Sequence, residues 1–400
     1  MVRYCMVILG SLAAMASAQD ICMSPTSTFT VKVNLFASEL GYYAFEECGD
    51  VVNPTIGMEV GETYTFVQAD RSNYFHPMGF SYFPDGAHDG VDELEPGIGL
   101  GSDASCAETL SCPAPMYFLN DDYLGNYSNI EEVLPVSTGA EDFGLDAYEP
   151  LFFHPMPEWV GYGEFSIQLR FDDESYDKDI FYFCHIHQFM SGRIKLMKNG
   201  ELVSPEDEPP LGYTYDEPGA FDETCGTYGL DAFQLPHPEC PSTFVCDAGP
   251  ENQPFASCIN AMNCHMVVGM TTGVSSESNL ALFIHQMIPH HQNAVNMAKT
   301  LLLTGDVPCE DLTNDEDPYC VMQVILREIV NGQNFQIQAM RGLLEALNLP
   351  ATDDCTVPVA IDGLDGLGSI VERQNPPPIE DSEDGAAPVD RVGGPFRRRV

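Results

Sequence analysis

The stretch YFCHIHQFMSGRIKLM, residues 182–197, decides the fold of the first half of this chain. An apolar run ends at Cys184, a short segment with two His and one Met follows, and a second apolar run occupies residues 194–197. Aromatic and β-branched residues on both sides of a turn indicate two strands joined by a tight loop. Cys184, His187 and Met190 therefore lie at the end of one strand and in the turn after it.

Further runs of this kind occur throughout residues 27–205, with turn residues between them. Short strands in such a pattern predict a β-sandwich. A long segment containing Gly, Asp and Pro interrupts the pattern between Phe83 and Tyr148, and we expect it to be loop. The other predicted strands cover residues 28–36, 63–68, 165–171 and 180–184.

The chain changes character after the predicted sandwich. Residues 206–258 are rich in Pro, Gly, Asp and Cys, which indicates a disulfide-linked connector. Residues 259–350 are rich in Met and have helical periodicity. Residues 351–400 are rich in Pro, Gly and acidic residues, as is typical of a disordered tail. We therefore expect a β-domain over residues 19–205 and a helical domain over residues 259–350.

Charge limits the partners that the chain can have. It contains 61 acidic and 16 basic residues, for a formal net charge of -45. Nucleic acids and anionic lipid surfaces attract Lys and Arg, so neither is an expected partner. An acidic surface of this kind mainly keeps a protein in solution and mildly attracts cations.

Residues 1–18 have the pattern of a secretory signal peptide. Arg3 supplies a positive start, residues 6–14 are apolar, and residues 16–18 (Ala-Ser-Ala) form a small-x-small cleavage site. No later stretch stays apolar for the roughly 18 residues of a membrane-spanning helix, so no transmembrane segment is expected. We expect an exported protein, either secreted or at the cell surface, and periplasmic if the source is bacterial.

Export makes disulfides expected among the cysteines. Fourteen Cys are present, and thirteen remain once Cys5 leaves with the signal peptide. If Cys184 is a metal ligand, the other twelve can form six disulfides, although a free thiol explains the odd number equally well. Spacing favours Cys22–Cys48, Cys106–Cys112 and Cys309–Cys320, and leaves Cys225, Cys240, Cys246, Cys258, Cys264 and Cys355 unassigned.

Cys184, His187 and Met190 form the pattern C-x2-H-x2-M, and His76 in NYFHPMGF (residues 73–80) offers a second imidazole. Thiolate and thioether sulfurs stabilise Cu(I), whereas imidazoles stabilise Cu(II), so this donor set suits copper with Met as a weak axial ligand. A rigid strand–loop–strand scaffold that hardly differs between the two oxidation states can pass one electron at little cost. These residues predict a copper site.

The stretch quoted at the start resembles the last two strands of the cupredoxins, the small blue copper proteins, whose C-x(2–4)-H-x(2–4)-M loop supplies three of four ligands. The tight spacing here is similar to the amicyanin loop. The family's first His lies on an earlier strand or loop, which matches His76. The resemblance implies a cupredoxin-like Greek-key β-sandwich that holds a type 1 (blue) copper on His76, Cys184, His187 and Met190.

Alternatives to this assignment stay open. His154 in FFHPM competes with His76, because His76 precedes Cys184 by 108 residues. Cys184 could instead form a disulfide. His185 neighbours Cys184 in a strand, so its side chain should point to the opposite face. Multicopper oxidases, in which such a flanking His binds a second cluster, need several His-x-His pairs; this chain has one, so a trinuclear centre is not expected.

A second group of donors lies in FIHQMIPHHQNAVNMAKTLL, residues 283–302. At about 100° per residue, Met287, His290, His291 and Met297 share one apolar face of a helix, which we expect to point into the core. The polar residues Gln292, Asn293, Asn296 and Lys299 fall on the opposite face.

A later helix, roughly residues 319–347, places Gln333 and Gln336 on its apolar face. Buried amides and imidazoles need hydrogen-bond partners, so these residues either satisfy one another or line a metal or small-ligand pocket. Soft sulfur donors from the helices are Met266, Met270, Met287, Met297 and Met340.

The block M-x-P-H-H-x-x-A-x-x-M-A at residues 287–298 resembles the domain-of-unknown-function family 305, which consists of ferritin-like four-helix bundles. A second block of that family, Q-x-x-E-I-x-x-M-R, matches from Gln333 to Arg341, with Gln336 in place of the Glu. Members of the family have been linked to copper binding. The resemblance implies a ferritin-like bundle with a possible second copper site, whose candidate ligands are Met266, Met270, Met287, His290, His291, Met297 and Met340.

These features together predict an exported copper-binding protein that acts in one-electron transfer, in copper homeostasis or in both, with a redox partner that the sequence does not identify. An electron carrier or copper-handling protein is favoured over an enzyme, because no second complete site with an open coordination position can be assembled. The alternatives are a copper-dependent oxidoreductase and a secreted structural or adhesive protein with vestigial copper sites.

Overall fold

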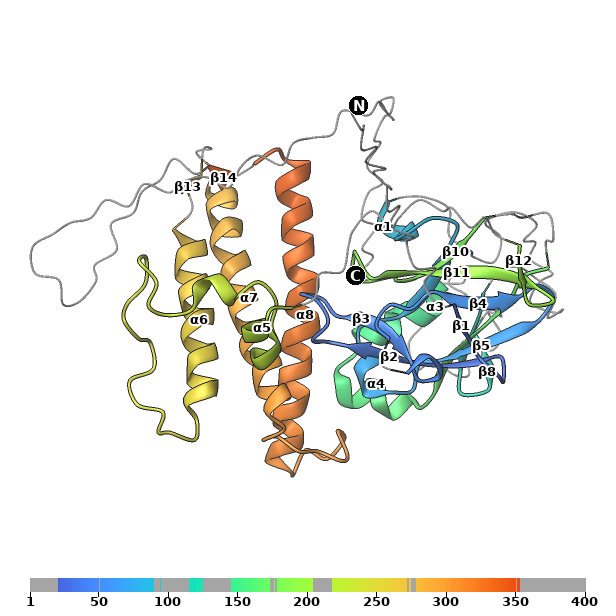
Figure 1. Ribbon diagram of the computed structural model, residues 1–400, viewed down its shortest axis with the longest axis horizontal. Coiled ribbons are helices and arrows are strands. Elements are labelled where there is room, and N and C mark those ends of the chain that lie inside the picture. The colour runs from blue at the N-terminus through green and yellow to red at the C-terminus, as the bar shows by residue number, and fades with distance from the viewer. Residues whose placement is uncertain are drawn as a thin grey trace, which may run out of the picture.

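The computed structural model describes residues 21–49, 51–89, 94, 115–124, 145–172, 176, 178–203, 218–271, 273–274, 278–349 and 351–352. The predicted signal peptide, the predicted Cys106–Cys112 disulfide and nearly all of the acidic tail lie outside these residues. Within them, β-sheets occupy the first half of the chain and long helices the second half (Figure 1). The prediction of a multidomain β + α fold is confirmed at this level.

Two six-stranded sheets build the β-domain. One has the order β1-β4-β11-β10-β6 with β12 paired to β11, and the other has the order β3-β2-β5-β9-β7-β8. The first contains β1 (Cys22–Met23), β4 (Ile56–Glu59), β6 (Met78–Ser81), β10 (Ile180–Cys184), β11 (Ser191–Lys198) and β12 (Glu201–Leu202). The second contains β2 (Thr28–Asn34), β3 (Tyr42–Phe45), β5 (Thr63–Val67), β7 (Met116–Leu119), β8 (Asp122–Tyr123) and β9 (Phe165–Arg170).

The two sheets face each other across a core of aromatic rings. Along β2, buried residues alternate with half-buried ones, as expected for a strand with one face in the core. Phe66 of β5 and Phe80 of β6 have ring centroids 5.0 Å apart, and those of Tyr43 in β3 and Tyr182 in β10 are 6.0 Å apart. The five predicted strands are confirmed as β2, β5, β9, β10 and β11.

The segment between Phe83 and Tyr148 was predicted to be loop, and its described part corrects this. β7 pairs with β9 and β8 pairs with β7, so both extend the second sheet. Tyr117 of β7 is fully buried and packs on Tyr148 with ring centroids 4.9 Å apart. A run of only four apolar residues carries too little periodicity to be assigned from sequence, and the pairing with β9 makes it a strand.

Three long helices, α6 (Gln253–Met270), α7 (Asn279–Thr304) and α8 (Pro318–Ala346), form the helical domain. The side chain of Ser278 caps α7 and that of Asp317 caps α8. The shorter elements are α1 (Gly86–Asp89), α3 (Leu145–Tyr148), α4 (Met156–Tyr162), α5 (Ala220–Cys225), the 3-10 helices η1 (Glu46–Cys48), η2 (Arg71–Asn73), η4 (Glu149–Phe153) and η5 (Asp231–Phe233), and the strand pair β13 (Gly273–Val274) and β14 (Ala351–Thr352).

The helices stand side by side, with α7 between α6 and α8, and α8 next to the β-domain (Figure 1). The short α5 packs against α7, so the part of the chain that is described supplies three long helices and one short one. Four long helices stay a prediction. No helix in the described ranges is long and apolar enough to cross a membrane.

Four disulfides are present among the described residues. The predicted pairs Cys22–Cys48 and Cys309–Cys320 are confirmed. Cys225–Cys258 and Cys240–Cys264 tie residues of the predicted connector to α6, which itself begins at Gln253 within that connector. Much of the connector therefore belongs to the helical domain. Cys184 and Cys246 are free, Cys184 buried and Cys246 exposed.

The orientation of α7 differs from the prediction. Lys299 and Asn293, expected to face solvent, are 1% and 8% exposed, whereas His290 and Met297, expected to face the core, are exposed. Periodicity identifies the apolar face of a helix but assumes that the neighbouring surface is apolar. Here Lys299 meets main-chain oxygens in a loop of the β-domain, and the Asn293 amide donates to Asn263 Oδ1 in α6, so polar side chains are buried.

Glu39, in the loop before β3, collects contacts from both helices. The Lys299 ammonium donates to the main-chain oxygens of Ser38 at 2.7 Å and Glu39 at 3.3 Å. The Glu39 carboxylate accepts from Gln292 at 2.8 Å and from Arg341 at 3.3 Å. Burial lowers the pKa of Lys299 to about 8, although the nearby Glu39 carboxylate opposes the shift. A positive charge is thus held between the domains at a cost in desolvation.

The substitution Lys299→Met should remove a pH dependence of stability. Below pH 8, Lys299 is charged in both the folded and the unfolded chain, and the cost of burying the charge is fully present. Between about pH 8 and about pH 10.5 the folded chain loses the proton first, so the unfolded chain binds more protons and stability rises with pH. Over that range the free energy of unfolding of the wild type should rise by roughly 3 kcal/mol relative to Lys299→Met. Urea unfolding of both proteins at several pH values measures this free energy. If it depends on pH in the same way in the wild type and in Lys299→Met, the lowered pKa of Lys299 is contradicted.

Candidate metal centre

The end of β10 and the loop after it bring Cys184 and His187 to His76. The Cys184 Sγ lies 3.6 Å from His76 Nδ1 and 3.7 Å from His187 Nδ1. The candidate ligand atoms of the three residues all lie within 4.8 Å of one another, and all three side chains are fully buried. A thiol and two imidazoles therefore converge on one point inside the protein.

These separations are those that a single metal ion would require. For a metal about 2.3 Å from sulfur and about 2.0 Å from each nitrogen, sulfur–nitrogen distances of 3.6 and 3.7 Å correspond to angles of roughly 115–120° at the metal. Such angles lie between tetrahedral and trigonal coordination. Met190 is fully buried in the same loop, and its carbonyl accepts a hydrogen bond from the Cys184 amide at 3.2 Å. The donor set therefore fits a metal.

The loop from Cys184 to Met190 is held in shape by contacts to its own sulfur and to a neighbouring loop. The His187 amide donates to Cys184 Sγ at 3.3 Å. Phe189, directly before Met190, has a φ of 61°, which is unfavourable for a bulky side chain. Its amide donates to the Asp85 carboxylate at 3.0 Å, which anchors the strained residue. The strain lies at the position that turns the chain back into β11.

The loop that carries His76 is held by Gln68, whose side chain is fully buried in the β-domain. The Gln68 amide nitrogen donates to Asn73 Oδ1 at 3.1 Å and to the His76 carbonyl at 2.7 Å. Its oxygen accepts from the Met78 amide and the Tyr148 hydroxyl, both at 3.0 Å. Both donors and both acceptor positions of the amide are in use. His76 is therefore presented by a rigid network.

The pKa values of the three side chains at the centre follow from their burial. Burial raises the pKa of the Cys184 thiol to about 12, although hydrogen bonds from the His187 and Ile186 amides oppose the shift. Burial also lowers the pKa of His187 to about 4 and that of His76 well below its usual value. Near neutral pH the site holds a protonated thiol and two neutral imidazoles. Only the thiol must lose a proton to bind a metal.

His154 and His185 lie outside this group. His154 directly follows η4, and its Nδ1 lies 3.0 Å from Glu158 Oε1 and 2.9 Å from the Tyr162 hydroxyl. His185 Nδ1 lies 2.9 Å from Glu149 Oε2. The structure thus places His76, and not His154, beside Cys184.

Two residues at the centre were missed in the sequence. A ring nitrogen of His88 lies 2.9 Å from the Cys184 carbonyl oxygen. Asn331, in the middle of α8, lies beside both imidazoles, with Oδ1 3.2 Å from His76 Nε2 and its main-chain oxygen 3.3 Å from His187 Nε2. No sequence signal links Asn331 to His76, because the two are 255 positions apart and in different domains.

The described contacts of the candidate ligands in the helices are with other protein groups, and they do not bring these ligands together around one point. His291 Nδ1 lies 3.0 Å from the Met287 carbonyl oxygen, and its Nε2 lies 2.9 Å from Gln336 Oε1. Met266 Sδ lies 3.3 Å from the amide nitrogen of Asn293. Imidazole, amide and thioether groups here have protein partners, which is the structural alternative left open by the sequence. Metal binding by the helical domain stays a prediction.

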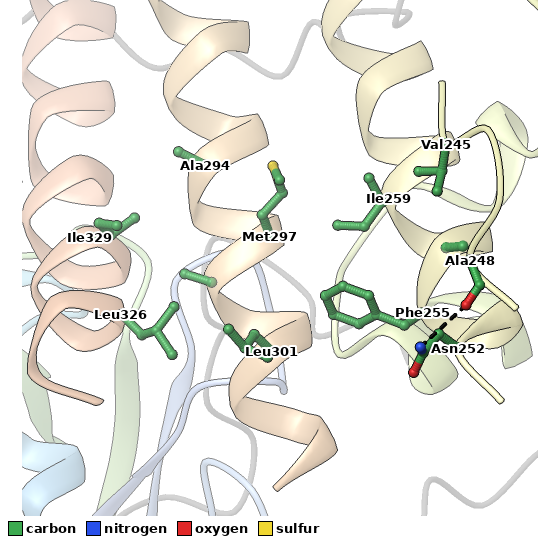
Figure 2. A pocket seen from close by; sticks show the side chains of 12 residues that line it. Val245, Ala248, Asn252, Phe255, Ile259, Ala294, Met297, Leu301, Leu326 and Ile329 are labelled. Carbon is green, nitrogen blue, oxygen red and sulfur yellow. Dashed lines mark hydrogen bonds between the residues drawn. The ribbon is translucent and has the colours of Figure 1, made fainter. Parts of the chain in front are cut away.

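Met297, a member of that predicted site, lines an apolar cavity of about 550 Å³ (Figure 2). The cavity lies between α6, α7, α8 and the loop before α6, and its lining includes Phe255, Ile259 and Leu326. The lining contains one polar side chain, Asn252, whose amide donates to the Ala248 carbonyl at 3.2 Å. The surroundings of Met297 are therefore apolar and lack metal donors among the lining residues.

His237, Cys240 and Cys264 form a second cluster with atoms close enough for a metal. The sulfurs of Cys240 and Cys264 are joined in a disulfide, so neither can act as a thiolate ligand. With its disulfide intact, the cluster is structural.

Comparison of the chain with protein-family models, with curated proteins and with solved structures gives no match. The assignment of the site therefore rests on its own residues and geometry.

Metal binding at pH 5 should release clearly fewer than three protons per ion, because the Cys184 thiol is protonated while burial lowers the pKa of both histidines. Histidines with an ordinary pKa near 6.5 would be charged at pH 5, and about three protons would be released. Titration with Zn²⁺, which accepts the same thiolate and imidazole ligands, in a weakly buffered solution with a pH indicator measures the number. Release of three protons would show that the imidazoles are not desolvated, and Cys184→Ser is the control.

Proposed function

We propose that this chain is an exported copper protein whose β-domain is cupredoxin-like and whose type 1 copper transfers single electrons. His76, Cys184, His187 and Met190 would hold the metal. The observation that carries the proposal is the convergence of the Cys184 sulfur with the Nδ1 atoms of two histidines at 3.6 and 3.7 Å in a fully buried pocket.

The donor set supports copper over the other metals that bind thiolate and imidazole. Structural zinc sites are built from four Cys and His ligands, whereas the fourth candidate here is the thioether of Met190, a soft and weak donor. Two imidazoles, one thiolate and one thioether form a set that would allow copper to change its oxidation state with little movement of its ligands. Bound copper would supply a one-electron redox couple at this site.

The enclosure of the centre supports electron transfer over catalysis on a bound substrate. All four candidate ligands are fully buried. A catalytic metal needs an open coordination position that a substrate can reach, whereas an electron can pass through a closed shell of protein. The buried hydrogen bonds of Gln68 add the rigidity that such transfer favours.

The disulfides support the proposed export. Four disulfides among the described residues are expected of a protein that folds in an oxidising compartment, and they accompany the signal-peptide pattern of residues 1–18. For the helical domain we propose the ferritin-like bundle implied by the residue pattern 287–298, with three long helices and α5 as its support.

Loading the wild-type chain with Cu(II) should produce an intense blue colour, from charge transfer between the Cys184 thiolate and the metal. Cys184→Ser should abolish the colour, because serine is not a thiolate donor. Cys246→Ser is the matched control, since among the described cysteines Cys246 is the other free one and it is exposed. Visible absorption measures the colour of each protein, and metal analysis measures its bound copper. A colourless, copper-free wild type would favour the vestigial-site alternative.

His76→Ala and His154→Ala should differ in their effect on the centre. Loss of His76 removes a ligand, so the blue colour should disappear or be replaced by the weaker spectrum of an altered site. Loss of His154 should leave the colour unchanged, because its ring contacts Glu158 and Tyr162. Electron paramagnetic resonance of the Cu(II) forms distinguishes the two variants. A normal spectrum for His76→Ala would overturn the ligand assignment.

A further inference from the structure

Asn331 in α8 touches both histidines of the candidate centre from the helical domain. The residue is 2% exposed. Its side-chain oxygen lies 3.2 Å from His76 Nε2, and its main-chain oxygen lies 3.3 Å from His187 Nε2. Its amide nitrogen donates to the main-chain oxygen of Tyr74 at 3.0 Å. One residue of the helical domain therefore supplies a contact to each imidazole and to the loop that carries the first.

These contacts determine which nitrogen of each imidazole carries the proton. The Tyr74 carbonyl can only accept, so the nitrogen of the Asn331 amide must face it and the oxygen must face His76. His76 Nε2 must then be the donor. His187 Nε2 also faces a carbonyl, and it must donate as well. In both neutral rings the lone pair is left on Nδ1, the nitrogen that faces Cys184 Sγ.

The same face of α8 covers the loop that carries the ligands. Gln338 lies two turns after Asn331, and its side chain accepts from the Gln188 amide at 3.1 Å and donates to the Gln188 carbonyl at 3.4 Å. Phe335 lies one turn after Asn331 and packs edge-on against Phe153, with ring centroids 5.7 Å apart. Positions i, i+4 and i+7 of a helix share one side, so Asn331, Phe335 and Gln338 form one continuous surface of α8, which we call the wall. His187, beneath that wall, has no exposed surface.

Domain packing alone does not require these contacts. Lys299 and Arg341 hold the domains together around Glu39, and Asn334 joins them through a 3.3 Å hydrogen bond to the Glu39 carbonyl. Asn334 is as buried as Asn331, at 1% exposed, and lies on the same helix, but its described hydrogen bond does not reach a histidine of the centre. Asn334 is therefore a matched control for the contacts that Asn331 makes with the two histidines.

We propose that α8 is a structural part of the metal centre, in which Asn331 is a positioning residue for both imidazole ligands and the helix closes the centre to water and to external partners at His187. The inference rests on the proposed function for the identity of the metal. A hydrogen bond to the far nitrogen orients a metal-bound imidazole and selects its tautomer. Retention of the metal would then depend on the helical domain being docked.

The test compares Asn331→Ala with Asn334→Ala in the full chain loaded with copper and reduced to Cu(I). In the wild type and in Asn334→Ala, proton–nitrogen NMR should show a slowly exchanging Nε2 proton on His76. Asn331→Ala should lose this slow exchange, and it should yield copper to a strong Cu(I) chelator about 10- to 100-fold faster. Its reduction potential, and the visible band of its Cu(II) form, should also shift, which a purely structural change at a distance would not cause.

Equal chelator rates for the two variants, or an unchanged Asn331→Ala, would overturn the inference. If Asn331→Ala does not fold, as judged by circular dichroism, Gln338→Ala takes its place, and faster extraction than from Asn334→Ala is expected because the wall over Gln188 is opened. A wild type that binds no copper would instead contradict the proposed function. The same NMR comparison with Zn²⁺ would then decide the role of Asn331 separately.

Discussion

The burial of one thiol and two imidazoles in contact with one another is the constraint on which the rest of the structure depends. A polar atom removed from water costs free energy unless it gains a partner. The Nδ1 atoms and the sulfur can share a metal, but both Nε2 atoms point away from that position and need acceptors. Asn331 of α8 supplies both acceptors, so the β-domain by itself does not complete the pocket that it builds.

Directional polar contacts accompany the apolar core where the domains meet. The Glu328 carboxylate accepts from the Met156 amide, Arg71 donates to the Cys309 carbonyl, and Lys299 donates to Ser38. Apolar surfaces tolerate sliding by part of a turn, whereas hydrogen bonds are directional and are lost when the helix moves. These hydrogen bonds, beside apolar contacts such as Phe335 on Phe153, therefore hold α8 in the register that places Asn331 over the histidines. The cost is the desolvation of groups such as the Lys299 ammonium, whose pKa is lowered accordingly.

Local features of the chain were predicted well because they depend on near neighbours. Short β-branched runs specified β2, β5, β9, β10 and β11, and spacing specified the disulfides Cys22–Cys48 and Cys309–Cys320. β7 was not predicted from the sequence, because its four residues become a strand only by pairing with β9. The faces of α7 were assigned wrongly for a related reason. Periodicity shows that a helix has two faces, but the surface against which each face packs lies elsewhere in the chain.

The sequence alone determined that Cys184, His187 and Met190 belong to one short loop, because the two strands around it are separated by only six residues. It also determined the soft donor set and hence the class of metal that we propose. Tertiary structure decided between His76 and His154, since both occur in the same FHPM motif and only the network around Gln68 brings one of them to the sulfur. It also decided that Asn331 belongs to the centre. A hydrogen bond between residues 255 positions apart leaves no local trace in a sequence, because only the docking of two separately patterned domains brings its atoms together.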